Sequence, residues 1–339
     1  MSKLFVIQND THAKNFAVMA REAIARGEQV SIILLDGATH ETTERYLGED
    51  LACRIERVEP TAQPFYRSGS WRRVQVCTRF RGWARVAIGV FDEVIIGNDG
   101  ALQKVIIKAA RARNARCHVT VVLDGLLTRE AGWTAMAKRR LQSVAERLGV
   151  DEFVPSTVGT SRRIDEIVVM HESVADVLSF HGVPRASIRV APLPRHAAIR
   201  ATGKRRAAGK SRILFLGSAY LWHGARAGHE RQVADFNEFA RFAGNSMDFE
   251  CRLRMHPRDD AALYPEMAHA PVAISAGSES LEDDLTWADI VVASRSSGLF
   301  DAMLAGRRAY VYTAHFPAPN EDAFLRSLPV IQRFEELGQ

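Results

Sequence analysis

Two polar turns in the second half of the sequence carry residue types suited to phosphate chemistry. His256-Pro257 follows an apolar stretch, and Ser296-Ser297 follows another and precedes a helical pattern. A helix N-terminus offers unpaired N–H groups and the positive end of the helix dipole, so seryl hydroxyls there favour a phosphate ligand. An imidazole can donate a hydrogen bond to the same ligand. We therefore predict that both turns face one nucleotide.

Further residues at the ends of predicted strands extend this site. Gly217-Ser218 ends the strand predicted over residues 212–216 and forms a small-residue turn. Arg254, Arg258 and Arg295 add positive charge, although strand alternation allows only some of them to face a ligand. No tight Asp-x-Asp metal motif is present, so we expect no metal site.

The first half of the sequence offers carboxylates at predicted strand ends. Asp124, in Asp124-Gly125 after the strand over residues 118–123, is a catalytic candidate because ligands bind beyond the carboxyl ends of parallel strands. Without a partner motif, an Asp-Gly turn is most often only a turn. The alternatives are Asp10, Glu172 and Asp99, the last within Asn98-Asp99-Gly100.

The strands and helices alternate, which favours a parallel α/β sheet. Strand-helix-strand patterning opens at residue 4 and restarts at residue 212 after a basic, glycine-containing stretch without apolar periodicity. We therefore predict an N-terminal Rossmann-like domain over 1–195, a linker over 196–211 and a C-terminal nucleotide-binding domain over 212–339. No GxGxxG follows the first strand, so no dinucleotide fingerprint is assigned.

Composition excludes several classes. The 339 residues suit roughly two domains of about 150 residues each. The four cysteines form no CxxC pair, which is typical of buried thiols in a reducing compartment. No apolar run reaches the ~18 residues of a membrane span, and the N-terminus lacks a signal-peptide profile. The net charge of +5 suits an anionic partner, but no nucleic-acid-binding motif is present. We expect a cytoplasmic protein.

A basic, aromatic helix is predicted over residues 71–88. Such a helix can lie on a membrane surface, or it can pack its aromatic side into the core. We favour packing into the core.

The order of Asp124-Gly125, His256-Pro257 and Ser296-Ser297, with Gly306 after the last helix, resembles bacterial GT-B glycosyltransferases, most closely the sialyltransferase and polysialyltransferase-like group. The resemblance covers about 200 residues of short motifs. It implies a GT-B type α/β fold, with two Rossmann-like domains facing a central cleft. It also implies metal-independent, inverting transfer of sialic acid or a related ulosonic acid from a CMP donor to a bacterial surface glycan, without a further cofactor.

By this resemblance, His256 hydrogen-bonds or protonates the departing CMP phosphate, Pro257 fixes the turn, and Ser296 and Ser297 bind the same phosphate. Gly217, Ser218 and Arg258 complete the donor side, while Asp10, Asn98 and Asp99 lie on the acceptor side. The family motif has two acids before its glycine. Here the first position is Leu123, which leaves the identity of the base open.

Three alternatives remain open. The chain could be a GT-B transferase using a UDP, GDP or dTDP sugar, an epimerase of the UDP-GlcNAc 2-epimerase type, or a non-catalytic scaffold of the same fold. The expected partners are a nucleotide sugar and a glycan or glycolipid acceptor, with a peripheral contact to anionic membrane and none to nucleic acid.

Overall fold

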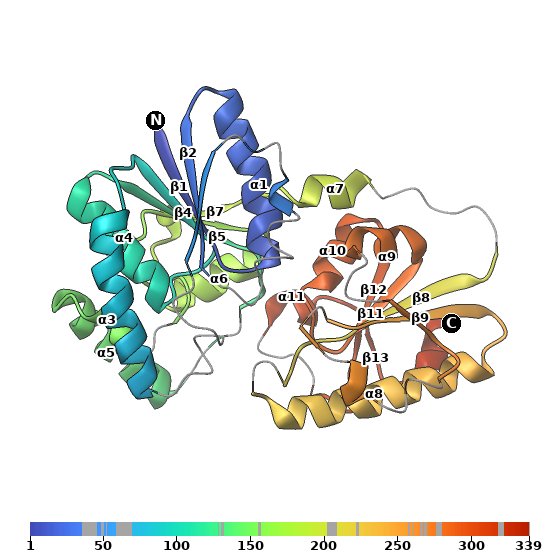
Figure 1. Ribbon diagram of the computed structural model, residues 1–339. Coiled ribbons are helices and arrows are strands. Elements are labelled where there is room, and N and C mark those ends of the chain that lie inside the picture. Colours follow the sequence, from blue (N-terminus) through green and yellow to red (C-terminus); the bar gives the residue numbers. More distant parts are fainter. Residues whose placement is uncertain are drawn as a thin grey trace. The chain divides into compact units, whose positions relative to one another are not determined.

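The computed structural model divides into two compact units, Met1–Arg195 (unit 1) and His196–Gln339 (unit 2), each with its own parallel sheet (Figure 1). The structure describes residues 1–35, 46–48, 51, 53–58, 70–127, 129, 132–154, 157–201, 209–221, 224–256, 258–259, 261–264, 267, 270–275, 280–317 and 322–338.

Unit 1 is built on a seven-stranded sheet with the order β3-β2-β1-β4-β5-β6-β7. Its strands are β1 (Ser2–Ile7), β2 (Gln29–Leu34), β3 (Arg54–Arg57), β4 (Glu93–Ile96), β5 (His118–Leu123), β6 (Glu166–Val169) and β7 (Ile188–Val190). Its helices are α1 (Asp10–Ala25), α3 (Ser70–Ala87), α4 (Ala101–Arg113), α5 (Trp133–Arg147) and α6 (Glu172–Phe180), with the 3-10 turns η3 (Asp151–Phe153) and η4 (Arg185–Ser187).

Helices cover both faces of this sheet because side chains alternate along each strand. Phe5 of β1 packs on Phe16 of α1, with ring centroids 5.8 Å apart. Leu4 and Val6 point to the opposite face and join a core with residues of α3, α4 and α6. This arrangement follows from the reversal of strand order between β1 and β4, since right-handed crossovers then place helices on opposite faces.

Helix α3 settles the alternative posed by its sequence. Its apolar side, including Cys77, Phe80 and Ala84, lies buried in the core of unit 1. Packing into the core is therefore confirmed, and the exposed side of α3 is arginine-rich: Arg72, Arg79 and Arg85 are exposed.

Unit 2 has a six-stranded sheet with the order β10-β9-β8-β11-β12-β13. Its strands are β8 (Ser211–Leu216), β9 (Phe249–Arg254), β10 (Ala273–Ser275), β11 (Ile290–Ala293), β12 (Arg308–Tyr312) and β13 (Val330–Ile331). Its helices are α7 (His196–Ala201), α8 (Arg226–Asn245), α9 (Leu281–Trp287), α10 (Gly298–Leu304) and α11 (Ala323–Arg326), with η5 (Ala261–Leu263) and η7 (Phe334–Gly338).

Phenylalanine side chains dominate the core between α8 and the sheet of unit 2. Phe215 of β8 lies 5.7 Å from Phe236 and 5.2 Å from Phe239, both on α8. Phe334 and Tyr312 stack at 4.4 Å and close the same layer beside β13. The long helix α8 is therefore fixed against the sheet by large rings along its length.

The segment predicted as a linker, residues 196–211, is partly folded. Its first six residues form α7, which contacts α10, and Ser211 begins β8. His196 of α7 is 1% exposed, and its ring is tilted against that of Phe300, with the ring centroids 5.4 Å apart. The sequence did not predict α7, because a short helix held by tertiary contacts shows little apolar periodicity; the bounds of the linker stay a prediction. Residues 202–208 lie outside the described part of the chain.

Gly97, directly after β4, lies so close to the ring of His12 that a larger residue does not fit. A Cβ added at Gly97 would lie 2.0 Å from Nε2 of His12, so Gly97→Ala must displace that buried ring. We expect a loss of about 1–3 kcal/mol of stability. The control is Gly82→Ala within α3, where nothing lies within 4 Å and the better helix former should add roughly 0.5–1 kcal/mol. Thermal and urea unfolding measure both; equal effects would contradict the packing argument.

Candidate functional site

In unit 2, three strands end close to the point at which the strand order of the sheet reverses. The order β10-β9-β8-β11 places the reversal between β8 and β11, the position at which open parallel sheets bind ligands. Ser218 follows β8, His256 follows β9, and Ser296 and Ser297 follow β11. The structure therefore brings four of the predicted donor-side residues to one edge of one sheet.

A buried glutamine that the sequence analysis missed ties these turns together. Gln232 of α8 is 4% exposed, and its Oε1 accepts the N–H of Ser218 at 2.7 Å. Its Nε2 donates to the carbonyl of Ser218 at 2.9 Å and to Oδ2 of Asp259 at 3.2 Å. The hydroxyl of Ser218 donates in turn to the carbonyl of Arg295 at 2.7 Å. These bonds fix the turns after β8, β9 and β11 relative to one another.

The same network includes Tyr264. Its hydroxyl donates to Oδ2 of Asp259 at 2.5 Å and lies 3.2 Å from Nδ1 of His229. Burial, with the adjacent Asp259 carboxylate, raises the pKa of the Tyr264 phenol above its usual value. Tyr264 therefore keeps its proton and helps to anchor the turn after β9.

His256 is held by its own turn. Its Nδ1 accepts the N–H of Arg258 at 3.1 Å, and its carbonyl accepts the N–H of Asp259 at 2.8 Å. When one ring nitrogen of a neutral imidazole accepts a hydrogen bond, the proton resides on the other. The turn therefore sets His256 with Nε2 as the donor. Pro257 lies outside the described residues, so its predicted role in aiming this turn stays a prediction.

The two serines after β11 differ in their bonding. Oγ of Ser296 accepts the N–H of Gly298 at 3.1 Å. Ser297 is the N-cap of the seven-residue helix α10, and its side chain makes no capping bond within the described residues. Both residues are half-buried, so hydroxyl groups remain at the surface of this edge.

The structure also explains why Gly217 and Arg254 occupy their positions near this edge. A Cβ on Gly217 would lie 2.8 Å from Cζ of Phe236, so this glycine permits α8 to approach the end of β8. A direct contact of Gly217 with a ligand stays a prediction. Arg254 is 7% exposed and donates to Asp284 at 2.5 Å, so it holds α9 while Arg258 and Arg295 remain half-buried at the edge.

A second buried polar group of α8 holds the loops after β11 and β12. Asp235 is fully buried; its Oδ2 accepts the hydroxyl of Ser294, and its Oδ1 lies 2.8 Å from Nδ1 of His315. Burial raises the pKa of Asp235 from 3.8 to about 6, against the opposing effect of its bonds to Ser294 and His315. Asp235 thus adds a titratable support beneath the edge.

In unit 1 the equivalent reversal, between β1 and β4, is lined with neutral amides. Oε1 of Gln8, after β1, accepts from Nδ2 of Asn98 at 3.1 Å and from Nε2 of Gln103 at 2.6 Å. Asp10 lies in the first turn of α1, whose N-cap is Asn9. The predicted acceptor-side residues Asp10 and Asn98 therefore do lie at this edge.

Asp99 has a different position. It is 1% exposed, and its two oxygens accept the N–H groups of Gly159 at 2.7 Å and Ser161 at 3.1 Å. Burial raises the pKa of Asp99, while the pKa of the neighbouring buried Lys104 is lowered. Asp99 fixes the loop before β6, which argues against the acceptor-side role predicted for it.

Asp124 follows β5 at the carboxyl edge of the same sheet. Its Oδ2 is buried and makes no hydrogen bond within the described residues. Buried carboxylate oxygens are normally satisfied, so this one suits a hydroxyl donor from outside the chain. Leu123, where the family motif has its first acid, is 4% exposed and packs in the core. The role of Asp124 as a base stays a prediction.

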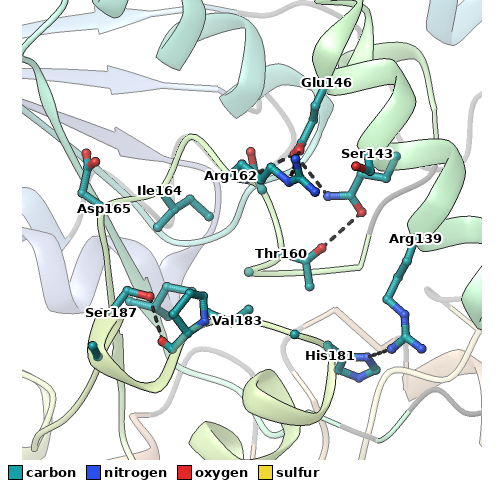
Figure 2. Close-up of a pocket in the computed structure, with 17 residues that line it drawn as sticks. Arg139, Ser143, Glu146, Thr160, Arg162, Ile164, Asp165, His181, Val183 and Ser187 are labelled. Atoms are coloured by element: carbon teal, nitrogen blue, oxygen red, sulfur yellow. Dashed lines mark hydrogen bonds and ion pairs between the residues drawn. The ribbon is translucent and has the colours of Figure 1, made fainter.

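A pocket in unit 1 lies at the opposite edge of the sheet (Figure 2). It has a volume of 670 Å³ and is lined by one side of α5, by Ile167 of β6 and by residues that precede β6 and β7. Nη1 of Arg139 lies 2.8 Å from Nδ1 of His181 across its mouth, and Thr160 bonds to Gln142 at 3.1 Å. None of the predicted site residues lines this pocket.

Within the described residues, no three or more His, Cys, Asp or Glu side chains form a group able to hold a metal ion. The same part of the chain contains no helix with the length and apolar character needed to cross a membrane.

Comparison with known proteins identifies the fold. No family model and no curated protein matches the sequence. Among solved structures, the UDP-GlcNAc 2-epimerase of Methanocaldococcus jannaschii, in complex with UDP-GlcNAc and UDP, matches with a TM-score of 0.62 and 10% identity over 99% of this chain and 91% of that one. The glycotransferase of kitacinnamycin matches with a TM-score of 0.56 and 15% identity, over 97% and 86%.

A third solved structure, the wall teichoic acid polymerase TagF with CDPG, matches with a TM-score of 0.54 and 11% identity, over 99% of this chain and 77% of that one. At these identities the likeness concerns the fold alone. The predicted fold class is confirmed: the chain has two Rossmann-like α/β domains of the GT-B type.

Asp235 generates a prediction about pH. The carboxyl group of Asp235 keeps its proton to a higher pH in the folded chain than in the unfolded chain. Ionisation of this group therefore destabilises the folded state. Its contribution to stability is therefore greatest below pH ~4 and falls through pH ~6, by up to about 3 kcal/mol. Asp235→Asn should remove this component. Melting temperatures of both proteins from pH 4 to 7.5 test it, with exposed Asp248→Asn as control; parallel curves for wild type and Asp235→Asn would contradict it.

Gln232 generates a prediction about local order. Gln232→Leu leaves the N–H of Ser218 without its partner, at a cost of about 1–3 kcal/mol, and removes one of the two hydrogen bonds that its carbonyl accepts, the other coming from the N–H of Tyr220. We expect faster hydrogen exchange in the turns after β8 and β9. The matched control is Gln142→Leu, which removes an equally buried glutamine from unit 1 and should leave these turns unchanged. Unaltered exchange at Ser218 in Gln232→Leu would show that the amide does not fix the turns.

Proposed function

We propose that the protein is a glycosyltransferase that uses a nucleoside-diphosphate sugar, with a UDP sugar as the first candidate donor. The observation that carries this proposal is the edge of unit 2 at which Gln232 ties three turns together. It carries an imidazole set as a donor, two seryl hydroxyls, and the half-buried Arg258 and Arg295. Hydrogen-bond donors and positive charge of this kind stabilise a departing phosphate.

The reaction follows from these groups. A base removes the proton of an acceptor hydroxyl, and the oxygen attacks the anomeric carbon as the bond from that carbon to the phosphate oxygen breaks. The nucleoside diphosphate leaves with the bonding electrons, and Nε2 of His256 donates to the oxygen that gains charge. Asp124, with its unsatisfied carboxylate oxygen, is the residue we assign as the base.

The choice of a diphosphate donor rests on the known neighbours. One neighbour is described with UDP-GlcNAc and UDP and another with CDPG. Neither adds support for the CMP-ulosonic donor implied by the motif order, so transfer of sialic acid is the less favoured version of the proposal. The acceptor class remains a glycan or glycolipid.

Epimerisation of a UDP sugar is the second candidate, favoured by the epimerases among the structural neighbours. That reaction must remove and return a proton on carbon, which requires groups that exchange protons at the sugar. The reversal point of unit 1 presents the amides of Gln8, Asn98 and Gln103, with Asp10 and His12 of α1 beside them. Amides bind hydroxyls, and either reaction could use the titratable side chains beside them, so the deuterium experiment below distinguishes epimerisation from transfer.

The proposal predicts nucleotide-dependent stabilisation. In a thermal-shift panel of UDP, GDP, dTDP, CDP and CMP, UDP should raise the melting temperature most, because it is the nucleotide of the first candidate donor. A ligand present at 100 times its Kd adds about 2.7 kcal/mol to the stability of the folded chain.

His256→Ala should lower turnover by about 10²–10³-fold. Asp124→Asn should keep the UDP shift and abolish transfer, which separates donor binding from catalysis.

The competing functions give different results. A shift with CMP but not with UDP would restore the ulosonic-acid donor. Deuterium incorporation at C2 of UDP-GlcNAc incubated in D₂O, detected by proton NMR, would establish epimerisation. No shift with any nucleotide would leave the non-catalytic scaffold as the remaining reading.

A further inference from the structure

Helix α5 carries an apolar face toward solvent. Its large exposed side chains recur every three to five residues, so that they lie on one side of the helix. These residues, with their exposed fractions, are Trp133 (76%), Met136 (53%), Leu141 (51%), Val144 (53%) and Leu148 just beyond the helix end (71%). We call this set the α5 stripe. A helix on the surface of a globular protein normally shows the opposite polarity.

The buried side of α5 carries Gln142 and Glu146 beside Ala135 and Ala145, and the hydrogen bonds of its polar residues fix the rotation of the helix. Gln142 is 3% exposed and accepts from Thr157 N–H at 3.3 Å and from the hydroxyl of Thr160 at 3.1 Å. Glu146 is 8% exposed and accepts the N–H of Arg162 at 3.2 Å. Turning the stripe inward would break these bonds and expose the polar side, so the apolar face is a consequence of a satisfied polar interior.

The charges on the outer side of α5 have one sign. Arg140 and Arg147 are exposed between the apolar residues of the stripe, and no acidic residue of α5 is exposed. Helix α3 contacts η3, as α5 does, and its 18 residues include five arginines but no Asp or Glu. The stripe therefore lies within a basic part of unit 1.

We propose that the α5 stripe docks unit 1 on an anionic lipid membrane. The helix would lie in the plane of the interface, with Trp133, Leu141 and Leu148 among the acyl chains and Arg140 and Arg147 at the lipid phosphates. Its 15 residues span about 22 Å, so the contact is a surface contact. This inference rests on α5 and on the arginines of α3, and it does not depend on the proposed transferase activity.

Charge decides against a second copy of the chain as the occupant. A two-fold contact between two α5 stripes is self-complementary, so it would place the arginines of one copy among those of the other. No exposed carboxylate on α5 is present to neutralise them. An anionic lipid surface supplies the missing negative charge and accepts the apolar side chains in the same contact.

The test is co-sedimentation of the full chain with vesicles. We expect binding to phosphatidylcholine vesicles containing 30–40% phosphatidylglycerol, as an order-of-magnitude choice of surface charge, weaker binding in 0.5 M salt, and little binding to pure phosphatidylcholine. Arg140→Gln with Arg147→Gln should lower the partition coefficient by roughly 30-fold. Leu141→Ser with Val144→Ser should lower it by about tenfold or more.

Matched controls remove equivalent groups elsewhere. Met247→Ser changes an 80% exposed side chain of unit 2, and Arg226→Gln with Arg333→Gln removes two exposed arginines, with side-chain exposures of 87% and 77%. Both controls should bind vesicles as the wild type does. An equal loss in Arg226→Gln with Arg333→Gln and in the α5 arginine variant would show that overall charge drives binding, and an equal loss in Met247→Ser and in the α5 serine variant would show that the apolar residues of α5 have no special role; either result overturns the proposal.

Two measurements on the Leu141→Ser, Val144→Ser protein distinguish other occupants. Light scattering that shows a wild-type dimer dissociating in the variant would assign the stripe to a contact between copies. A clear fall in melting temperature would assign it to a contact within the chain. Either result, or absence of binding to anionic vesicles, overturns the proposal.

Discussion

The candidate site of unit 2 depends on a single buried amide. Gln232 satisfies both the N–H and the carbonyl of Ser218 and reaches Asp259 across the edge of the sheet. A buried amide without partners would cost about 1–3 kcal/mol, so the turns after β8 and β9 must keep the positions that satisfy it. The hydroxyl of Ser218 passes the constraint to Arg295, next to the serines.

Helix α8 can exert this control because its inner face carries polar and apolar anchors at helical spacing. Gln232 and Asp235 hold loops from four strands, while Phe236 and Phe239 fill the core beneath them. The close approach of Phe236 to Gly217 brings the helix near enough for its amide to reach the backbone. Helix α8 therefore sets the relative positions of the turns at the carboxyl edge of the unit 2 sheet.

The elements that carry regular apolar patterns were predictable. The strands before Ser218, His256 and Ser296 follow from short apolar runs, and they position the turns where the sequence suggested. The supports beneath them were not predictable, because a Gln or an Asp in a helical pattern is normally assigned to solvent, and only tertiary packing shows it to be buried. The same limit explains Asp99, whose two backbone partners lie about 60 residues away along the chain.

Hydrogen-bond satisfaction, rather than polarity, decides which side of a helix lies inside this protein. On α8 the buried Gln232 and Asp235 lie among phenylalanines, so that helix shows a recognisable apolar face as well. On α5 the buried Gln142 and Glu146 have backbone and hydroxyl partners, and the large apolar side chains are left outside. From hydrophobicity alone, one would expect α5 to turn its large apolar side chains toward the core and its buried polar side chains toward solvent. Because its inner bonds oppose that rotation, the exposed apolar residues of α5 follow from the fold itself.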